Sequence, residues 1–311
     1  MLHVDQVVKR YGSFTAVDGV SFSAEPGRIF GLLGPNGAGK TSTIRMITYI
    51  TVPDAGSVTL GGQAVGPASQ RRMGYLPEER GLYKKMKVGE QLVYLAQLKG
   101  MRRSDAERTC RDWMGRLELG AQWNAEVEAL SKGMQQKVQF VATIAHAPDL
   151  LILDEPFSGL DPINADLLRD IIQELRADGR IILFASHRLE QVEKLCDDVC
   201  LIAQGEVVLS GALRDVKRRF GSNTLTVRFD GPDAWLDRLQ QQRLVTVESR
   251  SRGAAEVLLA DATPARQVLE AALNAGADVS HFELHELPLN VIYKLAVERG
   301  VSSDLNAPVS L

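Results

Sequence analysis

A glycine-rich segment near the N-terminus limits what this 311-residue chain can fold into more than any other feature. The segment reads Gly34-Pro35-Asn36-Gly37-Ala38-Gly39-Lys40-Thr41. It follows a short apolar run over residues 28–33 and precedes a helical pattern over residues 41–50. Glycines let the backbone curl with successive N–H groups pointing inward, and the helix adds the positive end of its dipole. This combination predicts a phosphate-binding loop and an α/β fold of the P-loop NTPase class.

Further apolar runs predict a sheet around this loop. Residues 150–153 and 180–185 form two apolar runs, the second beginning at Arg180, and each run is followed by a helical segment. Such runs are typical of strands that are buried on both faces of a mainly parallel sheet. Residues 17–24 and 56–61 instead alternate or carry turn residues, which predicts an additional antiparallel β layer.

Two segments outside this sheet are expected to form separate parts of the fold. The period becomes helical over about residues 87–147, and helices over 88–98 and 104–117 would form a helical insert in the nucleotide-binding domain. After residue 221 the predicted order is β-α-β-β-α-β-α, which resembles a small α+β module of ferredoxin-like type. The expected division is residues 1–220, residues 221–300 and a loose tail over residues 301–311.

The composition excludes several classes of protein. The net charge is −3, from 36 basic and 39 acidic residues, so there is no general basic field to hold nucleic acid. No apolar stretch of membrane-spanning length lacks a charge or a breaker, and Asp5 and Lys9 interrupt the N-terminal segment where a secretory signal would be apolar. Cys110, Cys196 and Cys200 lack the spacing of a metal site. We therefore expect a chain that stays in the cytosol.

Two acids follow the apolar run over residues 150–153. A carboxylate at the C-terminal end of a buried parallel strand lies beside the phosphate-binding loop. Asp154 would hold Mg²⁺ there, usually through water, and Glu155 would orient and polarise the water that attacks the γ-phosphate. Lys40 would reach the β- and γ-phosphates, and the Thr41 hydroxyl would ligate Mg²⁺. Taken alone, the two acids would more often be a solvated strand end, but a complete phosphate-binding loop reverses that preference.

A third motif carries a resemblance to a known family. The segment reads Leu130-Ser131-Lys132-Gly133-Met134-Gln135-Gln136-Lys137. It resembles the signature of the ATP-binding cassette (ABC) family, which begins Leu-Ser-Gly-Gly-Gln, and it lies 20 residues before Leu150. The resemblance covers roughly residues 1–220 and implies that the signature of one subunit closes over ATP held by another. Ser131 and the Gly133 amide would then contact the γ-phosphate, although Ser131 alone is also a good helix N-cap.

The resemblance extends to three more positions. Asp161, in Pro156-Phe157-Ser158-Gly159-Leu160-Asp161, resembles the dimer-contact loop that links the two ATP sites. His187 resembles the switch histidine that contacts the γ-phosphate, although a lone histidine after a strand is more often structural. Tyr11 lies 23 residues before Gly34, where family members stack an aromatic ring on adenine; the alternative is a half-buried surface tyrosine.

Two positions depart from the common family pattern. Glu78 stands where most members carry a glutamine that senses Mg²⁺ and the membrane subunit, and Lys132 replaces the first glycine of the signature. Together they resemble a branch of bacterial and archaeal exporter ATPases, including sodium-extrusion types, that often carries an extra C-terminal module.

These motifs and the resemblance predict a complete ATP site with Mg²⁺. The expected catalytic residues are Lys40, Glu155 and His187. The expected Mg²⁺ ligands are Thr41, Glu78 and Asp154. The residues expected to contact ATP are Tyr11, Gly34, Pro35, Asn36, Gly37, Ala38, Gly39, Lys40, Thr41, Ser42, Ser131, Gly133 and Asp161.

The resemblance implies an ATP-hydrolysing subunit that powers transport, with export as the expected direction, through a separate integral membrane subunit. It further implies a head-to-tail dimer with a second ATP-binding subunit, a homodimer in the simplest case, bound peripherally at the cytoplasmic face of the membrane. The alternative is a soluble ABC-type ATPase that acts on DNA or ribosomes. It is disfavoured because the segment from Thr41 to Leu130 has only 90 residues and no sustained heptads, because the chain has one phosphate-binding loop, and because no nucleic-acid partner is expected at this charge. Intact Lys40, Asp154, Glu155 and His187 argue against a non-hydrolysing regulator.

Overall fold

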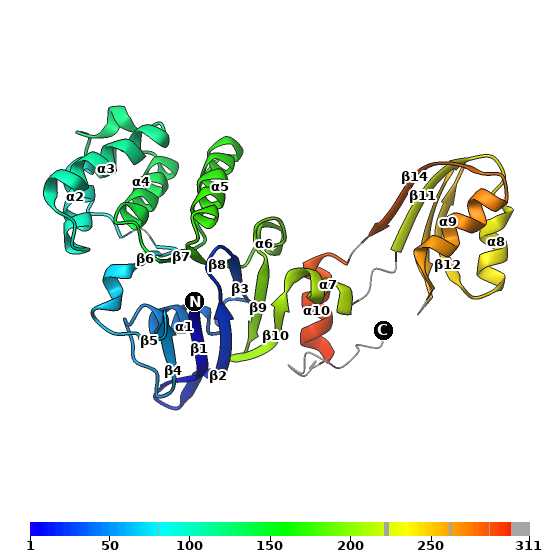
Figure 1. The fold of residues 1–311 in the computed structure, drawn as a ribbon, viewed down its shortest axis with the longest axis horizontal. Coiled ribbons are helices and arrows are strands. Elements are labelled where there is room, and N and C mark those ends of the chain that lie inside the picture. Colours follow the sequence, from blue (N-terminus) through cyan, green and yellow to red (C-terminus); the bar gives the residue numbers. More distant parts are fainter. Residues whose placement is uncertain (80, 221–223, 261–262, 286, 300–311) are drawn as a thin grey trace. The chain divides into compact units, whose positions relative to one another are not determined.

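The computed structural model describes residues 1–79, 81–220, 224–260, 263–285 and 287–299 (Figure 1). The described chain forms two compact units, residues 1–213 and residues 214–298. The boundary expected from the sequence, after residue 220, lies seven residues further along the chain. Gly300 and the expected tail over residues 301–311 lie outside the described residues.

A mainly parallel sheet forms the centre of the first unit, in the order β10-β9-β3-β8-β7-β6. Its strands are β3 (Ile29–Leu33), β6 (Met73–Leu76), β7 (Leu150–Asp154), β8 (Ile181–Ser186), β9 (Asp198–Ala203) and β10 (Glu206–Ala212). All neighbouring strands are parallel except the edge pair β9 and β10. Every residue of β3, β7 and β8 is buried, as the apolar runs predicted.

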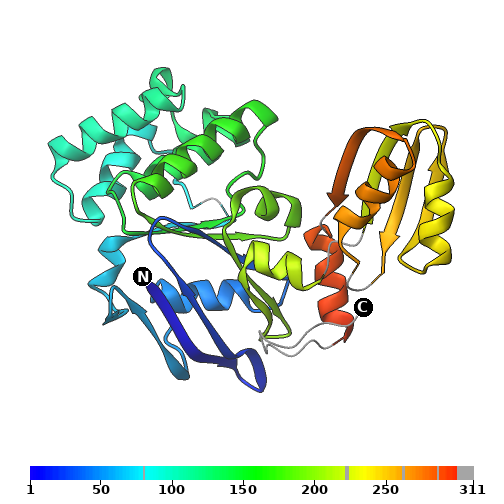
Figure 2. The same cartoon turned by 45° about the vertical axis from the view of Figure 1, so that its right-hand side comes forward.

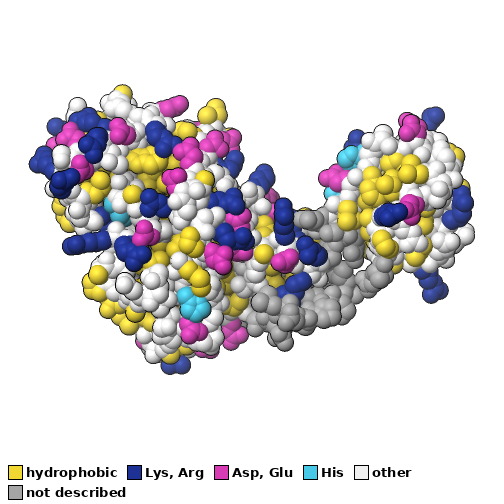
Figure 3. Space-filling model, viewed as in Figure 1, with side chains coloured by type: hydrophobic (Ala, Val, Ile, Leu, Met, Phe, Trp, Pro, Cys, Tyr) yellow, Lys and Arg dark blue, Asp and Glu magenta, His cyan; other side chains and the backbone are white. Residues whose placement is uncertain are grey.

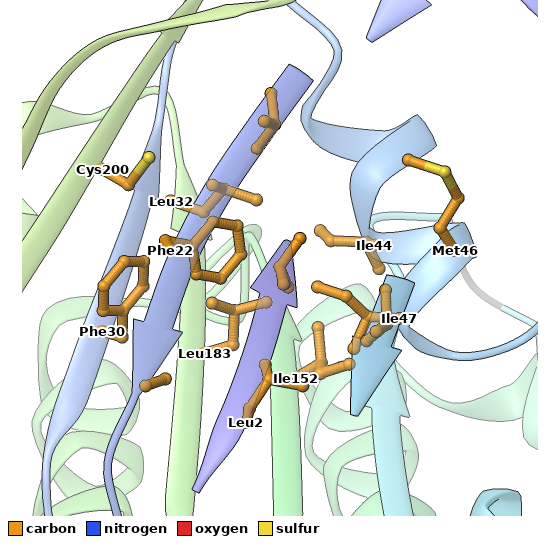
Figure 4. Close-up of a cluster of buried hydrophobic side chains, with 14 of the residues drawn as sticks. Leu2, Phe22, Phe30, Leu32, Ile44, Met46, Ile47, Ile152, Leu183 and Cys200 are labelled. Carbon is orange, nitrogen blue, oxygen red and sulfur yellow. The ribbon is translucent and has the colours of Figure 1, made fainter. Parts of the chain in front are cut away.

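An antiparallel sheet forms a second layer, in the order β2-β1-β4-β5. Its strands are β1 (Leu2–Tyr11), β2 (Phe14–Ala24), β4 (Ala55–Leu60) and β5 (Gln63–Ala64), and helix α1 (Lys40–Ile47) packs against the same core. Figure 4 shows Leu2 and Phe22 of this layer facing Phe30 and Ile152 of the parallel sheet. The Phe22 and Phe30 rings stack with centroids 4.9 Å apart, so one apolar core joins the two sheets.

Most helices of the first unit lie on the side of the parallel sheet away from the antiparallel strands (Figure 1). The segment expected to be a helical insert contains α2 (Val88–Leu98), α3 (Arg103–Arg116) and α4 (Lys132–Ile144). Helix α5 (Pro162–Ala177) follows β7, and α6 (Leu189–Leu195) follows β8. Short 3₁₀ turns occupy residues 69–72, 120–122 and 127–129. No helix within the described ranges is both long and apolar enough to cross a membrane.

The second unit is a small α+β domain with a core of its own. Its antiparallel sheet has the order β12-β13-β11-β14, and helices α8 and α9 cover one face (Figures 1 and 2). The strands are β11 (Thr224–Asp230), β12 (Val245–Ser251), β13 (Ala254–Leu259) and β14 (Asp278–His285). The helices are α7 (Leu213–Arg219), α8 (Ala234–Gln241), α9 (Ala265–Asn274) and α10 (Leu289–Arg299). Phe229 and Trp235 pack edge to face in this core.

Candidate nucleotide-binding site

The glycine-rich loop connects the buried strand β3 to helix α1, as its sequence predicted. Gly34 has φ +152°, and a Cβ atom there would lie 2.2 Å from the Ile202 carbonyl oxygen. Gly39 has φ +109°, and its Cβ would lie 2.5 Å from the Ala16 carbonyl oxygen, so only glycine fits at both positions. No side chain caps the N-terminus of α1. Its first N–H groups therefore remain available to an anion.

Lys40 spans this loop. Its Nζ donates hydrogen bonds to the carbonyl oxygens of Gly34, at 2.6 Å, and of Pro35, at 3.0 Å. Burial lowers the pKa of the ammonium, and the nearby carboxylates of Asp154, Glu155 and Glu78 only partly offset that effect. The charge is thus held directly over the concave side of the loop, where phosphate oxygens would replace the two carbonyls as partners.

Asp154 ends strand β7 beside this lysine. Its side chain is buried, and burial together with the charges of Glu78 and Glu155 raises its pKa to about 6, although Lys40 acts in the opposite direction. Three carboxylates therefore face one ammonium. Oxygen donors with excess negative charge are suited to a hard divalent cation such as Mg²⁺.

Glu155 is held by the end of strand β8. It has φ +51°, an unusual backbone conformation for this residue type, and its carboxylate is buried. The carboxylate accepts hydrogen bonds from the Ser186 hydroxyl at 3.2 Å and from the His187 backbone N–H at 2.7 Å. The His187 ring Nδ1 is also 2.7 Å from it. Glu155 therefore has a fixed orientation, set by groups 31 and 32 residues along the chain.

One cavity of about 390 Å³ brings most of the expected site residues together. Those that line it are Tyr11, Asn36, Gly37, Gly39, Lys40, Thr41, Ser42, Glu78, Asp154, Glu155 and His187. Gly34, Pro35 and Ala38 belong to the same loop but do not line the cavity. Phe14 and Ala16 also line it and were not expected. Phe14 pairs with Tyr11 across the β1–β2 hairpin and is 63% exposed, so two aromatic rings lie at this side of the cavity.

The side chains at this site are too few to bind Mg²⁺ alone, so the substrate would have to provide further ligands. Thr41, Asp154 and Glu78 line the same cavity, but no group of three or more His, Cys, Asp or Glu residues in the described ranges could hold a metal alone. Mg²⁺ in nucleotide sites typically combines one or two protein ligands with phosphate oxygens and water. The residues therefore fit an ion that arrives with a triphosphate.

Ser131, Gly133 and Asp161 lie outside this cavity, at the starts of two other helices. Ser131 caps α4, because its hydroxyl accepts a hydrogen bond from the Met134 backbone N–H at 3.2 Å. Asp161 caps α5 by accepting from the Asn164 backbone N–H at 3.0 Å. Ser131 therefore acts as the helix N-cap that the sequence analysis named as its alternative role. The side chains of Ser131 and Asp161 are both exposed.

Three comparisons place the chain among known proteins. The ABC transporter family model matches residues 17–158, and the model for the C-terminal domain of ATP-binding proteins like DrrA1-3 matches residues 211–297. An uncharacterized ABC transporter ATP-binding protein of Bacillus subtilis (strain 168) is 42% identical over 94% of this chain and 97% of its own length. The Nod factor export ATP-binding protein I of Burkholderia pseudomallei (strain 1710b) is 37% identical, over 73% of this chain and 76% of its own.

A solved structure of the ATP-binding subunit of an ABC transporter has the same fold. It superimposes with a TM-score of 0.67 at 32% identity and covers 71% of this chain and 93% of that one. The match agrees with the phosphate-binding loop, the mixed sheet and the antiparallel layer described above. This chain therefore belongs to the ABC transporter family, as an ATP-binding subunit and an ABC ATPase.

Proposed function

We propose that this subunit hydrolyses ATP with Mg²⁺ in the 390 Å³ cavity and powers export through a separate integral membrane subunit. The observation that carries the proposal is the convergence of Lys40, Asp154, Glu155 and His187, from three separate segments, on one cavity beside a phosphate-binding loop. The export direction is supported by the Nod factor export relative, whose name states that direction.

Each residue has a distinct role in this proposal. The uncapped start of α1 and Lys40 bind the β- and γ-phosphates, and Tyr11 and Phe14 flank the adenine ring. Glu155 orients a water molecule and accepts its proton, while His187 contacts the γ-phosphate. Mg²⁺ would supply charge neutralisation of the triphosphate, with Thr41, Asp154 and Glu78 as the side chains that hold it. Ser186 holds Glu155 in place.

The exposed signature residues support a head-to-tail dimer. Ser131, Gly133 and Asp161 do not line this chain's own cavity, although the family resemblance assigns them to an ATP site. In a dimer of two copies, Ser131 and Gly133 of one copy would contact the γ-phosphate bound by the other. The α4 N-terminus provides backbone N–H donors for that contact.

A groove in the first unit supports contact with a membrane subunit. It has a volume of about 370 Å³ and lies beside the segment that contains Glu78 and the helix α2. Ile50 and Leu98, which are 57% and 60% exposed, line it together with Leu82 and Leu95. An exposed apolar groove of this kind is typical of a protein interface. The subunit would then bind peripherally at the cytoplasmic face of the membrane.

The second unit supports a ferredoxin-like classification. Read across the sheet from β14, the order is β14, β11, β13, β12, which is 4-1-3-2 when the strands are numbered along the chain, and all neighbours are antiparallel. This order and the β-α-β-β-α-β connection are those expected of the split βαβ module. Helix α10 follows as an addition.

Calorimetric titration of ATP with Mg²⁺ tests the site. Wild type should bind ATP, and Lys40→Ala should weaken binding and abolish hydrolysis, because the backbone amides only partly neutralise the triphosphate. Unchanged affinity in Lys40→Ala would contradict the assignment of the cavity. The transport role is tested by sequencing the adjacent genes: a polytopic membrane protein that binds this chain and stimulates its ATPase activity would support the role. A neighbouring membrane protein that does neither would contradict it.

The alternative of a soluble ATPase on DNA or ribosomes has less support. In the view of Figure 3, Lys and Arg side chains are interspersed with Asp and Glu over the first unit rather than gathered into one basic face. Nucleic acid is bound mainly through such a face. ATPase activity that rises severalfold with added duplex DNA or ribosomes, at physiological salt, would favour this alternative.

A further inference from the structure

Lys137 is a buried cation that the catalytic proposal does not use. It lies on helix α4, six residues after Ser131, and is only 5% exposed. Its Nζ donates to the Leu117 carbonyl oxygen and to the Asn164 Oδ1 atom, both at 2.8 Å. Burial lowers the pKa of this ammonium, and the charges of Glu118 and Asp161 only partly offset that effect. Both hydrogen-bond acceptors of Nζ are neutral. Keeping a charge on neutral acceptors in the interior is costly, so an apolar side chain would suit packing alone better.

The lysine is connected to Asp161 through one residue. The Asn164 Nδ2 donates to Asp161 Oδ2 at 2.6 Å, and its backbone N–H donates to Asp161 Oδ1 at 3.0 Å. Asn164 therefore holds both oxygens of Asp161, and Lys137 holds the remaining polar atom of the Asn164 amide. The order of hydrogen bonds fixes which way the amide faces, because only its oxygen can accept from an ammonium.

Helix α4 also contacts the loop over residues 156–161 at two earlier positions. Gly133 approaches this loop so closely that a Cβ atom there would lie 3.2 Å from the Gly159 carbonyl oxygen. Gln136 is buried and donates from Nε2 to the Pro156 carbonyl oxygen at 3.0 Å. Lys137 adds a contact just beyond this loop, to Asn164 in the first turn of α5, and its bond to Leu117 also satisfies a carbonyl at the C-terminal end of α3.

We infer that Lys137 is a positioning residue: through Asn164 it fixes Asp161 relative to Ser131, so that both meet a second copy of the chain as one rigid surface. The inference rests on the proposed head-to-tail dimer. Ser131 and Asp161 begin two different helices, and their separation must match the partner's cavity for both to engage at once. A displacement of about 1 Å in such a contact lowers turnover by up to roughly 10²-fold.

The test compares four variants of the full chain: Lys137→Met, Lys137→Arg, Asn164→Ala and the double variant Lys137→Met/Asn164→Ala. Lys137→Met should lower the ATPase kcat by roughly tenfold or more. It should leave the calorimetric affinity of the monomer for ATP within about twofold, since the ATP cavity does not include this residue. Lys137→Arg should recover most of kcat because it keeps a cation with several donors. The double variant should be no slower than Asn164→Ala alone, because both substitutions break one connection.

Arg180→Met is the matched control. Arg180 also holds two acceptors with a cation, the carbonyl oxygens of Ala147 and Pro148, both at 2.7 Å. It lies near the C-terminal ends of α4 and α5, whereas Ser131 and Asp161 lie at the N-terminal ends of these helices. This substitution should lower thermal stability without changing kcat. A structural role for Lys137 alone would produce the same pattern as the control, with a lower Tm and an unchanged kcat, and would overturn the inference.

A second measurement separates the inference from the dimer on which it rests. In a Glu155→Gln background, the dimer formed with ATP should dissociate more readily when Lys137→Met is added, as seen by sedimentation. If Ser131→Arg abolishes hydrolysis while Lys137→Met keeps wild-type kcat and dimer affinity, the dimer stands and the positioning role fails. If Ser131→Arg itself hydrolyses ATP at the wild-type rate, the proposed dimer fails and this inference fails with it.

Discussion

At the scale of single residues, the geometry around Glu155 decides what the site can do. The carboxylate is held by the Ser186 hydroxyl and by the backbone and ring of His187. These donors leave little freedom of rotation. A carboxylate fixed in this way costs no reorganisation when the water is activated. The same fixed geometry makes Glu155 the most informative position to change.

We expect Glu155→Gln to bind ATP while turnover falls by at least roughly 10²-fold, since the amide cannot accept a proton from water. The variant should also accumulate as a dimer with ATP. Phosphate release and size-exclusion chromatography measure the two effects. Glu206→Gln is the matched control, because Glu206 is exposed on the edge strand β10. Wild-type turnover in Glu155→Gln would remove this residue from the mechanism.

A separate prediction concerns His146 and the dependence of the free energy of unfolding on pH. Its Nε2 contacts the Met73 carbonyl oxygen, its Nδ1 is buried without a partner, and burial beside the Lys99 charge lowers its pKa to about 4. The unfolded chain binds this proton near pH 6.5 and the folded chain does not, so folding becomes less favourable as the pH falls from about 6.5 towards 4. The loss should reach up to about 2 kcal/mol between pH 7 and pH 5.

Urea unfolding of wild type and His146→Gln at pH 7 and pH 5 measures this contribution. The variant lacks the titrating ring, so its stability should fall less over this interval, while other groups affect both proteins equally. Equal losses in the two proteins would show that the ring is protonated in the folded state as readily as in the unfolded state.

The sequence located most of the residues that line the cavity, but it missed Phe14 and Ala16 and the residues whose hydrogen bonds orient site residues. Lys40, Asp154 and Glu155 follow from a local pattern of strand, loop and acid, and such patterns depend on neighbours in the chain. Ser186 and Lys137 act through hydrogen bonds to residues 27 to 31 positions away. No local pattern distinguishes them from an ordinary strand serine or helix lysine, and this is why only the structure identifies them.

At the scale of helices and strands, the spacing of the apolar residues along the chain explains which segments could be predicted. Helix α2 was expected over the residues that it occupies, because its apolar positions follow the helical period. Strand β1 was not expected. Its alternation of buried Leu2 and Val4 is interrupted near Gln6, which has φ +47°, and the pairing register with β2 shifts at that point. The bulge breaks the two-residue alternation of apolar side chains by which a strand is predicted from sequence.

A further prediction concerns the packing of helix α2 against Trp123. Gly89 lies so close to Trp123 that a Cβ atom would be 2.2 Å from the indole Cε2, and Arg111 covers that ring at 4.0 Å. Gly89→Ala should therefore destabilise the fold by about 1–3 kcal/mol, although alanine favours helices. Gly115→Ala in α3 is the control, because its Cβ would meet nothing within 4 Å; it should be neutral or stabilising by up to about 1 kcal/mol. Urea unfolding compares both, and a stabilised Gly89→Ala would contradict the packing.

At the scale of the whole molecule, each compact unit has its own apolar core. The first is shared by two sheets, and the second is built around Leu225, Val227 and Trp235. The change of pattern after residue 221 predicted a second domain because its strands alternate, whereas the strands of the parallel sheet are continuously apolar. The sequence alone could not predict the order of the strands in either sheet. Neighbouring strands such as β11 and β14 are nearly 50 residues apart in the chain, and only tertiary contacts pair them.

The last prediction concerns the assembly of two whole chains into one catalytic unit. A Ser131→Arg chain keeps its own phosphate-binding loop and should bind ATP, but the large cation should block closure over the partner's γ-phosphate and stop hydrolysis. A Lys40→Ala chain has the opposite defect. In a mixed dimer, one site joins an intact loop from the first chain to an intact signature from the second, and the other site carries both defects. Phosphate release measured against the mixing ratio should therefore rise above that of either inactive protein alone and peak near equal amounts, with at most half of the sites restored. If the Ser131→Arg chain alone hydrolyses ATP at the wild-type rate, the model of a site shared between two chains is wrong, and Ser131 is only the N-cap that its bond to Met134 makes it.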